Sequence, residues 1–173
     1  MYALKQKVVY PGKGVAYINS IIQKQIANNT AYFYELVFLH HQDLTILVPI
    51  ENASTIGIRP LCSRDNIAAL FALLAEPPPV TIISEPLISN WNKRNKGYKE
   101  KLQTGDPREI CRIYRYLKHL STKKELSFGE KDLLKQTEFL LAEEVAQVHG
   151  IHEEKATEQI RKAITFTQPH IQP

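Results

Sequence analysis

The stretch NWNKRNKGYKEKLQTGDPREICRIYRYLKHL, residues 90–120, concentrates the positive charge of this 173-residue chain. Between residues 91 and 124 there are eleven Lys or Arg and three acidic residues, a net charge of +8, whereas the whole chain carries +4. The single tryptophan, Trp91, lies directly beside this basic run. Clustered cations next to an aromatic side chain are typical of nucleic-acid-binding surfaces, so we expect such a surface here.

The second half of the stretch has the pattern of an amphipathic helix that begins at Asp106. Asp106 is a suitable N-cap, Pro107 takes the first helical position, and Glu109 adds an acid to the first turn. An apolar stripe is predicted to face the core and comprises Ile110, Ile113, Tyr114, Leu117 and Leu120. A basic stripe is predicted to point outward and comprises Arg108, Arg112, Arg115 and His119. This basic stripe is either a solvated face without a ligand or a phosphate contact, and the neighbouring run KRNKGYKEK favours phosphate contact.

The first half of the stretch, from about Asn90 to Leu102, is predicted to form another helix. Gly97 weakens its middle by roughly 1 kcal/mol relative to alanine. The residues alone leave two roles open for Trp91, a core ring packed beside Tyr98 and Leu102 or an exposed ring at a binding surface. The candidate DNA-binding lysines and arginines of this helix are Lys93, Arg94, Lys96 and Lys99.

The N-terminal 60 residues have the pattern of a small β-structure. Short β-branched and aromatic runs cover residues 7–10, 15–22, 32–39 and 45–48, and turn-forming residues separate them. Asn28 and Asn29 stand where a hairpin tip is expected, since asparagine tolerates positive φ. Runs that are apolar on both faces favour a small curled barrel.

After Arg59-Pro60 the hydrophobic period changes to that of helices. Ser63 can cap one helix, which prolines 77–79 stop. Ser127 and Glu130 form a capping box for a long helix that ends at Gly150, and a last helix is expected from about Glu153 to Ile164. The predicted fold class is therefore α+β, with the β-barrel first and an all-α domain of about five helices after it.

Membrane, secretory and catalytic functions have no support in the sequence. No apolar run approaches the ~18–20 residues that span a bilayer. The N-terminus MYALKQKVVYP lacks a signal-peptide stretch, so we expect a cytoplasmic protein that contacts no membrane. No catalytic motif is present, and we expect neither an enzyme nor a metal or cofactor.

The two cysteines, the histidine pairs and the glutamate pairs are predicted to have no chemical role. Cys62 and Cys111 lack metal-ligand spacing and are predicted to be buried free thiols. The histidine pairs His40/His41 and His149/His152 are expected at the surface. The acid pairs Glu143/Glu144 and Glu153/Glu154 are expected on solvated helix faces.

Six segments, in this order, resemble the CarD-like bacterial transcription regulators. They are VVYPGKGVAYI (8–18), DLTILVPIENASTIGIRPL (43–61), NWNKR (90–94), EKLQTGD (100–106), ELSFGEK (125–131) and LLAEEVA (140–146). The resemblance covers nearly the whole chain with the family's order and spacing. It implies an N-terminal Tudor-like barrel that binds the β subunit of RNA polymerase. It also implies a C-terminal helical domain that contacts promoter DNA at the upstream edge of the transcription bubble.

The resemblance assigns roles to individual positions. The family's DNA-wedging tryptophan matches Trp91, and its basic DNA contacts match Lys93, Arg94, Lys96 and Lys131. One family residue implicated in polymerase contact matches Lys24, and a second, often basic, matches Leu47, which is aliphatic here. The same region of the chain supplies three more candidate polymerase contacts, Asp43, Thr45 and Pro49.

The resemblance also moves the expected domain boundary. The residues alone place it at prolines 77–79, whereas the family pattern gives a barrel over residues 1–60 and a helical domain over residues 63–167. Residues 77–89 are then an extended connector within the helical domain, and residues 168–173 a disordered tail.

The function implied is stabilisation of the promoter open complex by a polymerase-bound protein, expected to be a monomer, that contacts minor-groove DNA without sequence specificity. One alternative is a Tudor- or SH3-like adaptor that binds a peptide or RNA. Another is a general nucleoid protein, which the net charge of −4 over residues 125–173 disfavours.

Overall fold

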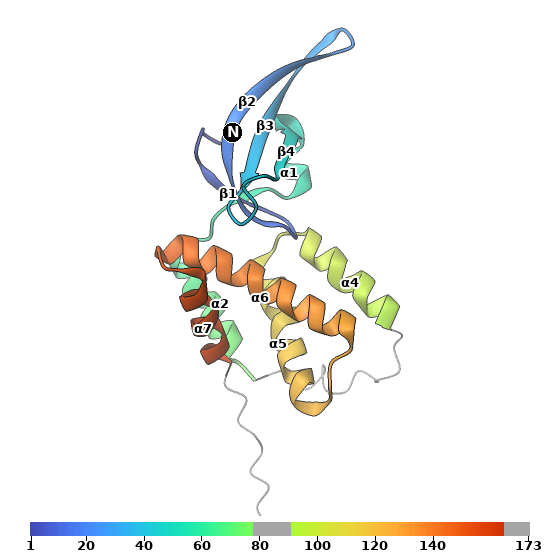
Figure 1. The fold of residues 1–173 in the computed structure, drawn as a ribbon, viewed down its shortest axis with the longest axis vertical. Coiled ribbons are helices and arrows are strands. Elements are labelled where there is room, and N and C mark those ends of the chain that lie inside the picture. Colours follow the sequence, from blue (N-terminus) through green and yellow to red (C-terminus); the bar gives the residue numbers. More distant parts are fainter. Residues whose placement is uncertain (78–90, 165–173) are drawn as a thin grey trace, which may run out of the picture.

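The N-terminal sixty residues form one five-stranded antiparallel sheet, and helices follow it (Figure 1). The computed structural model describes residues 1–77 and 91–164, except for the side chains of residues 91–93. The predicted α+β class with the strands first is therefore confirmed. The expected connector and C-terminal tail lie outside the described residues.

The strands are β1 (Lys7–Tyr10), β2 (Gly14–Ile26), β3 (Asn29–Phe38), β4 (Thr45–Pro49) and β5 (Arg59–Pro60), in the sheet order β4-β3-β2-β1-β5. The expected barrel takes the form of a curled sheet in which β4 and β5 are the two edges. Between these edges the chain forms η1 (Ile50–Asn52) and α1 (Ala53–Ile56). Ile50 and Ile56 pack against the core of the sheet, so short helical turns cover it where a closed barrel would have a strand ladder.

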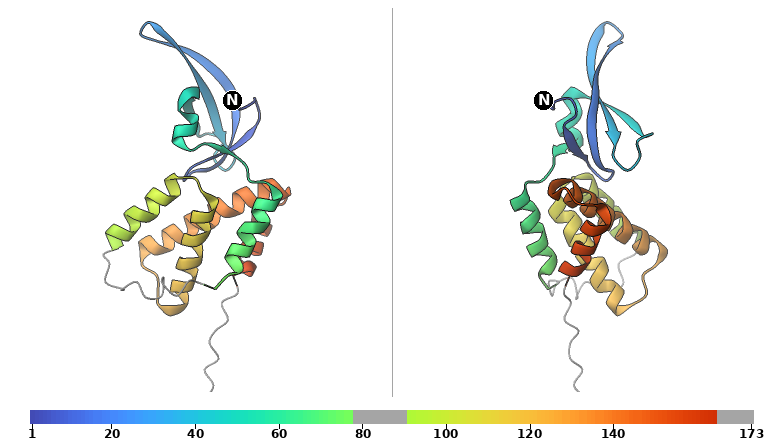
Figure 2. Two further views of the ribbon diagram at one scale, coloured as in Figure 1. Left: turned by 180° about the vertical axis from the view of Figure 1, so that it is seen from behind. Right: turned by 60° about the vertical axis from the view of Figure 1, so that its left-hand side comes forward.

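Strands β2 and β3 form a long hairpin that extends beyond the rest of the sheet (Figures 1 and 2). Both strands are longer than predicted, and only Ala27 and Asn28 lie between them. The residue with positive φ at this tip is Ala27, at 54°, so the role expected for the asparagines falls on their neighbour. A register shift between Ile18 and Ser20 interrupts the ladder, as a β-bulge does where a strand bends.

Five described helices follow the sheet: α2 (Arg64–Ala75), α4 (Trp91–Gln103), α5 (Pro107–Lys123), α6 (Phe128–His149) and α7 (Glu153–Ala163). The predicted caps at Ser63, Asp106, Ser127 and Gly150 are confirmed. Ser63 accepts a hydrogen bond from Asn66 N, and Asp106 accepts one from Arg108 N. Ser127 and Glu130 form the complete capping box, and Gly150 ends α6 with φ at 67°.

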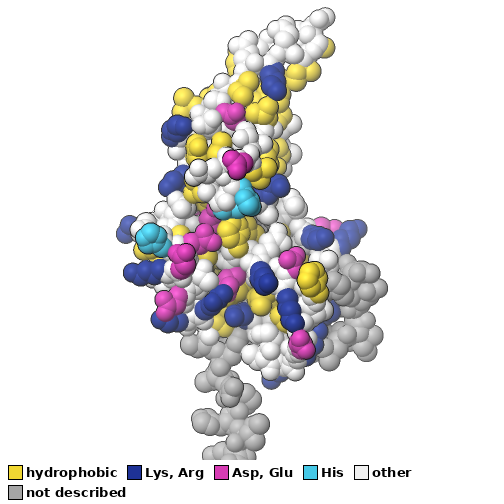
Figure 3. Space-filling view, in the orientation of Figure 1, with side chains coloured by type: hydrophobic (Ala, Val, Ile, Leu, Met, Phe, Trp, Pro, Cys, Tyr) yellow, Lys and Arg dark blue, Asp and Glu magenta, His cyan; other side chains and the backbone are white. Residues whose placement is uncertain are grey.

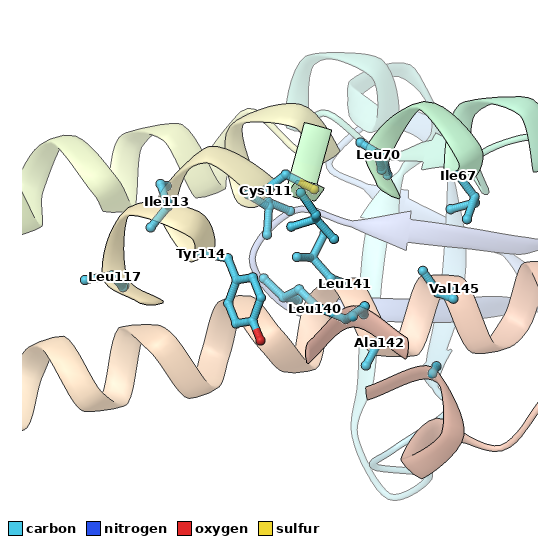
Figure 4. Packing of buried hydrophobic residues seen from close by; sticks show 14 of the residues in the cluster. Ile67, Leu70, Cys111, Ile113, Tyr114, Leu117, Leu140, Leu141, Ala142 and Val145 are labelled. Atoms are coloured by element: carbon cyan, nitrogen blue, oxygen red, sulfur yellow. The ribbon is translucent and has the colours of Figure 1, made fainter. Parts of the chain in front are cut away.

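Helices α2, α5, α6 and α7 share one apolar core (Figure 4). Its members include Ile67 and Leu70 of α2, Leu117 of α5 and Leu141 of α6, all nearly inaccessible to solvent. The stripe predicted for α5 is buried as expected. Leu102 of α4 also joins this core, and Tyr98 packs against it, which fixes one face of α4 inward.

The sheet is joined to α6 by two buried carboxylates, Glu143 and Glu144. Glu143 accepts a hydrogen bond from Val15 N at 2.7 Å and lies 3.1 Å from Nδ1 of His40. Glu144 accepts hydrogen bonds from Arg59 at 2.6 and 2.8 Å. The prediction that both acids lie on a solvated face is wrong, because at helical spacing they fall on the side of α6 that meets the sheet.

The same junction requires glycine at position 14. A Cβ atom there would lie 2.1 Å from Oε2 of Glu143, and φ at 107° is a conformation that side chains disfavour. Burial would raise the pKa of Glu144, but the hydrogen bonds from Arg59 and Cys62 N hold it below its ordinary value. Burial does raise the pKa of Glu143.

The thiol of Cys111 is buried as predicted, and that of Cys62 is half-buried. Burial raises the pKa of Cys62 to about 11 and that of Cys111 to about 12, so neither is a reactive thiolate near neutral pH. No described helix has the length and apolar character needed to cross a membrane.

Candidate nucleic-acid and protein interfaces

Helix α4 carries the exposed cations that the sequence assigns to DNA. Lys96 and Lys99 are exposed, and so is Arg108 at the start of α5. None of these three forms an ion pair with a residue in the described ranges, 1–77 and 91–164. Cations without an ion-pair partner in these ranges can bind phosphates, so these three are the strongest of the predicted DNA ligands.

Other cations of the basic stretch hold the helices together. Glu109 of α5 pairs with Lys101 of α4 at 3.2 Å and with Arg112 of its own helix. Burial would raise the pKa of Glu109, but hydrogen bonds from Lys101 and Arg112 lower it overall. The side chain of Arg112 is 54% exposed, so it can still exchange this weak surface pair for a phosphate.

Arg94 lies on the inner side of the start of α4. Its guanidinium is 3.9 Å from the buried carboxylate of Glu130, at the start of α6. Its side chain is 18% exposed and hydrogen-bonds Tyr116 of α5 at 3.5 Å. Arg94 therefore fixes α4 against α5 and α6 as much as it offers a charge to a ligand.

The predicted outward orientation of Arg115 is wrong. Its side chain is only 4% exposed and donates to the carbonyls of Glu76 and Pro77 at 2.7 Å. Those carbonyls follow the end of α2, where backbone acceptors lack helical partners and a cation is favourable. Arg115 therefore fixes the chain just after α2 to α5, and we leave it out of the candidate DNA surface.

Two predicted DNA-binding residues, Trp91 and Lys93, begin α4, but their side chains lie outside the described part of the structure. Lys131 is exposed in the first turns of α6 and pairs with Glu125 at 2.9 Å. Both partners of this pair face solvent, so the pair is weak and leaves Lys131 available. The start of α6 lies beside the start of α4 (Figures 1 and 2), and Glu130, the residue before Lys131, is 3.9 Å from Arg94 of α4.

The predicted polymerase contacts gather on one face of the sheet. Leu47 pairs with Glu35 across the β3–β4 ladder, and Pro49 pairs with Phe33. Because directly opposed residues share a face, Thr45, Leu47 and Pro49 lie on one face of the sheet. Lys24 belongs to it too, since its Nζ is 6.0 Å from the ring centroid of Phe33. Asp43 is exposed in the turn before β4.

This face, hereafter the outer sheet face, is partly apolar and borders a free edge. Leu47 is 36% exposed on β4, the end strand of the sheet. The opposite face of the hairpin borders a hollow of about 500 Å³, lined in part by Ile21, Tyr32 and Ile50. On the side of the molecule in Figure 3, hydrophobic side chains follow the sheet, whereas Lys and Arg side chains spread over the helical half with acidic ones among them.

Sequence reasoning missed the full roles of three residues, two of them buried and one exposed. Glu144 falls three residues after Leu141 and four before Val148, at the spacing of the buried stripe of α6. Glu130 was assigned to the capping box alone, yet it also binds Arg94 and Lys124. Phe128 has charged residues, Lys131 and Asp132, where a buried helical residue would have apolar neighbours.

No group of three or more His, Cys, Asp or Glu side chains suited to a metal occurs among the described residues. His40 meets a single carboxylate, that of Glu143. The described residues present two unlike surfaces: the basic helix α4 on one half of the molecule and a partly apolar sheet face on the other.

Comparison with known proteins matches both halves of the chain. Residues 2–62 match the family described as CarD-like/TRCF RID domain, and residues 82–161 match CarD, C-terminal domain. A relative from Bacillus subtilis (strain 168), named "Putative transcription factor YdeB", is 23% identical over 155 residues, which cover 90% of this chain and 97% of the relative.

Proposed function

The chain belongs to the CarD-like family of transcription regulators, and from this premise we propose that it binds the β subunit of RNA polymerase through its sheet. The helical half then contacts promoter DNA at the upstream edge of the transcription bubble and stabilises the open complex without reading the sequence. In this proposal the polymerase-binding unit is residues 1–60, and the DNA-contacting unit is residues 63–167.

One observation supports the proposal most strongly. Two unlike surfaces lie on different halves of the molecule, and hydrogen bonds join these halves. The outer sheet face offers Leu47 beside the free edge of β4, which suits a protein partner. Helix α4 offers Lys96 and Lys99 without a described ion-pair partner, which suits phosphates. Because Glu143 bonds α6 to the sheet, binding at one surface restricts where the other surface can lie.

Tethering explains how a small basic surface could act on one DNA site. A chain bound to polymerase presents α4 to the upstream duplex at high effective concentration, so weak phosphate contacts suffice. Phosphate contacts fix position and carry no sequence information. Trp91, at the start of α4, is the proposed wedge in the minor groove, since an inserted aromatic ring opposes reclosure of the bubble. Binding the open state alone shifts the equilibrium toward it.

Separation-of-function variants test the two surfaces. We expect Leu47→Asp to abolish polymerase binding and to leave DNA affinity unchanged, because a charge replaces the apolar contact. We expect Lys96→Glu with Lys99→Glu to leave polymerase binding intact and to weaken DNA binding. Each lost phosphate contact lowers the slope of log affinity against log salt by about 0.9. Pull-down with polymerase and anisotropy with labelled duplex DNA measure the two affinities.

The matched control for the sheet is Leu4→Asp, since Leu4 is 59% exposed and precedes β1, away from the β4 edge. This control should bind polymerase normally. Equal polymerase binding by Leu47→Asp would move the contact off the outer sheet face. Tight capture of a peptide or RNA by the sheet without polymerase would support the adaptor alternative.

Trp91→Ala tests the wedge. The variant should fold and bind polymerase normally, with a change in unfolding free energy below about 1 kcal/mol, and should shorten the lifetime of the open complex. A core tryptophan would instead cost about 3–5 kcal/mol on truncation. Thermal melting and promoter-complex decay, measured on the same variant, separate these outcomes. A large loss of stability with unchanged decay per folded molecule would remove Trp91 from the DNA contact.

A further inference from the structure

Phe128 is the most exposed aromatic side chain among the described residues, at 88%, and folding does not account for it. It occupies the first position of α6, next to the N-cap Ser127. Leu126, two residues earlier, is buried at 6% exposure. Of the two apolar side chains in this corner, the smaller one is therefore buried and the larger one is exposed to solvent. One helical turn onward it meets Lys131 and Asp132, which give it no apolar partner.

The charges around Phe128 favour an anionic partner. Residues 123–131 contain three lysines, Lys123, Lys124 and Lys131, and two glutamates. Glu130 is buried, at 2% exposure, whereas the side chains of Lys124 and Lys131 are 40% and 51% exposed. Over residues 123–132 the exposed cations are Lys123, Lys124 and Lys131 and the exposed acids are Glu125 and Asp132, so the exposed side chains of this corner carry one net positive charge.

Glu130 joins this corner to the proposed DNA helix. Its carboxylate accepts hydrogen bonds from Ser127 N at 2.8 Å and from Lys124 at 3.1 Å, and it lies 3.9 Å from Arg94 of α4. Burial alone would raise the pKa of Glu130, but these hydrogen bonds keep it low, so it stays anionic and attracts both cations. The corner between α5 and α6 is thus held beside the start of α4 (Figures 1 and 2).

We propose that this corner is a second DNA contact, in which Phe128 stacks on an unpaired base while Lys124 and Lys131 bind the flanking phosphates. The inference rests on the proposed function, since it extends the α4 surface around the edge of the bubble. An aromatic ring beside lysines is the arrangement by which proteins hold single-stranded nucleic acid. A continuous duplex offers no free base face, so the contact is specific for the junction between duplex and single strand.

The test compares full-length Phe128→Ala, Phe128→Trp and Tyr32→Ala with the wild type on forked, single-stranded and continuous duplex DNA, by fluorescence anisotropy. Tyr32 is a matched control because it is 52% exposed on β3, in the sheet half. Phe128→Ala should weaken binding to forked and single-stranded DNA about tenfold and binding to duplex less than twofold. Phe128→Trp keeps an aromatic ring at this position and should therefore bind the three DNAs as the wild type does. The salt slope should not change, because the ring binds no phosphate.

Three results would overturn the contact: unchanged affinity of Phe128→Ala for forked DNA, an equal loss on all three DNAs, or loss of polymerase binding with DNA affinity intact. The last result would assign Phe128 to a protein partner. Lys96→Glu, measured in parallel, separates this inference from the function on which it rests. If Lys96→Glu weakens DNA binding and Phe128→Ala does not, only the second contact fails; if the wild type binds none of the DNAs, both fail.

Discussion

Glu144 shows how one buried side chain can join segments that are far apart in the sequence. Its carboxylate accepts two hydrogen bonds from Arg59 of β5 and a third from the backbone of Cys62, just before α2. A buried carboxylate is stable only when its oxygens are paired in this way. Glu144 therefore fixes the point where the chain leaves the sheet and enters the helices.

Replacing Glu144 by glutamine should lower the free energy of unfolding by about 2–3 kcal/mol at pH 7. This is less than the cost of breaking a fully buried pair, because the side chain of Arg59 is 22% exposed. Urea unfolding with an unchanged m-value measures the loss. Glu154→Gln, on the exposed face of α7, is the control and should change stability by less than about 0.5 kcal/mol.

The same variant should also change the pH dependence of stability. The folded pKa of Glu144 is lowered from its ordinary value of 4.5, so its stabilising contribution is present above pH 4.5 and is lost as pH falls through the lowered value. The difference between wild type and Glu144→Gln should therefore shrink as the pH falls below 4.5. A constant difference down to pH 3 would show that the charge of Glu144 does not stabilise the fold.

Helix α4 has low intrinsic stability, and contacts with the other helices hold it in place. Gly97 stands in its middle, and its position has open space and no positive φ. Leu102 and the pair between Lys101 and Glu109 hold the C-terminal half, and Arg94 holds the start. Helix α4 therefore owes its position to tertiary contacts, and its exposed lysines are presented by a helix with little intrinsic stability.

Two glycine substitutions should act in opposite directions. Gly97→Ala should stabilise the protein by about 0.5–1 kcal/mol, since alanine is the better helix former and nothing lies within 4 Å of the added Cβ. Gly14→Ala should destabilise it by more than about 1 kcal/mol, because φ is 107° and Glu143 occupies the space. Thermal melting of both variants measures the contrast. Stabilisation by Gly14→Ala would mean that Glu143 does not pack against β2.

The junction between the sheet and α6 determines whether the two halves of the molecule move as one body. It contains Glu143 with Val15 N, Glu144 with Arg59, and surface bonds such as Lys7 to Gln147 at 2.7 Å. The proposed tether depends on this junction, because a loosely joined helical half would lose effective concentration at the DNA.

Native-state hydrogen exchange tests the coupling between the halves. In the wild type, the slowest amides of β2 and of α6 should report the same free energy of opening, since both are released together by global unfolding. In the double variant Glu143→Gln with Glu144→Gln, the two sets should separate, and the sheet should open independently of the helices. Unequal values already in the wild type would show that the halves unfold separately.

Parts of the candidate interfaces followed from the sequence and parts did not. The clustered cations predicted a basic surface on α4, and the exposure of Lys96 and Lys99 agrees with that prediction. The helical stripe placed Arg115 on the same outward side as Arg108, yet only one of them is exposed. Spacing along a helix gives the direction of a side chain, whereas the end of α2 that buries Arg115 comes from another part of the chain.

Local sequence specifies several of the helix ends. The N-cap at Asp106, the capping box of Ser127 and Glu130, and the glycine end at position 150 each act within two to four residues, so local sequence suffices to specify them. The roles of the two buried acids of α6, in contrast, depend on contacts between distant parts of the chain. Glu143 meets Val15 from 128 positions away and Glu144 meets Arg59 from 85, and such pairing exists only once the sheet packs on the helix and removes both carboxylates from water.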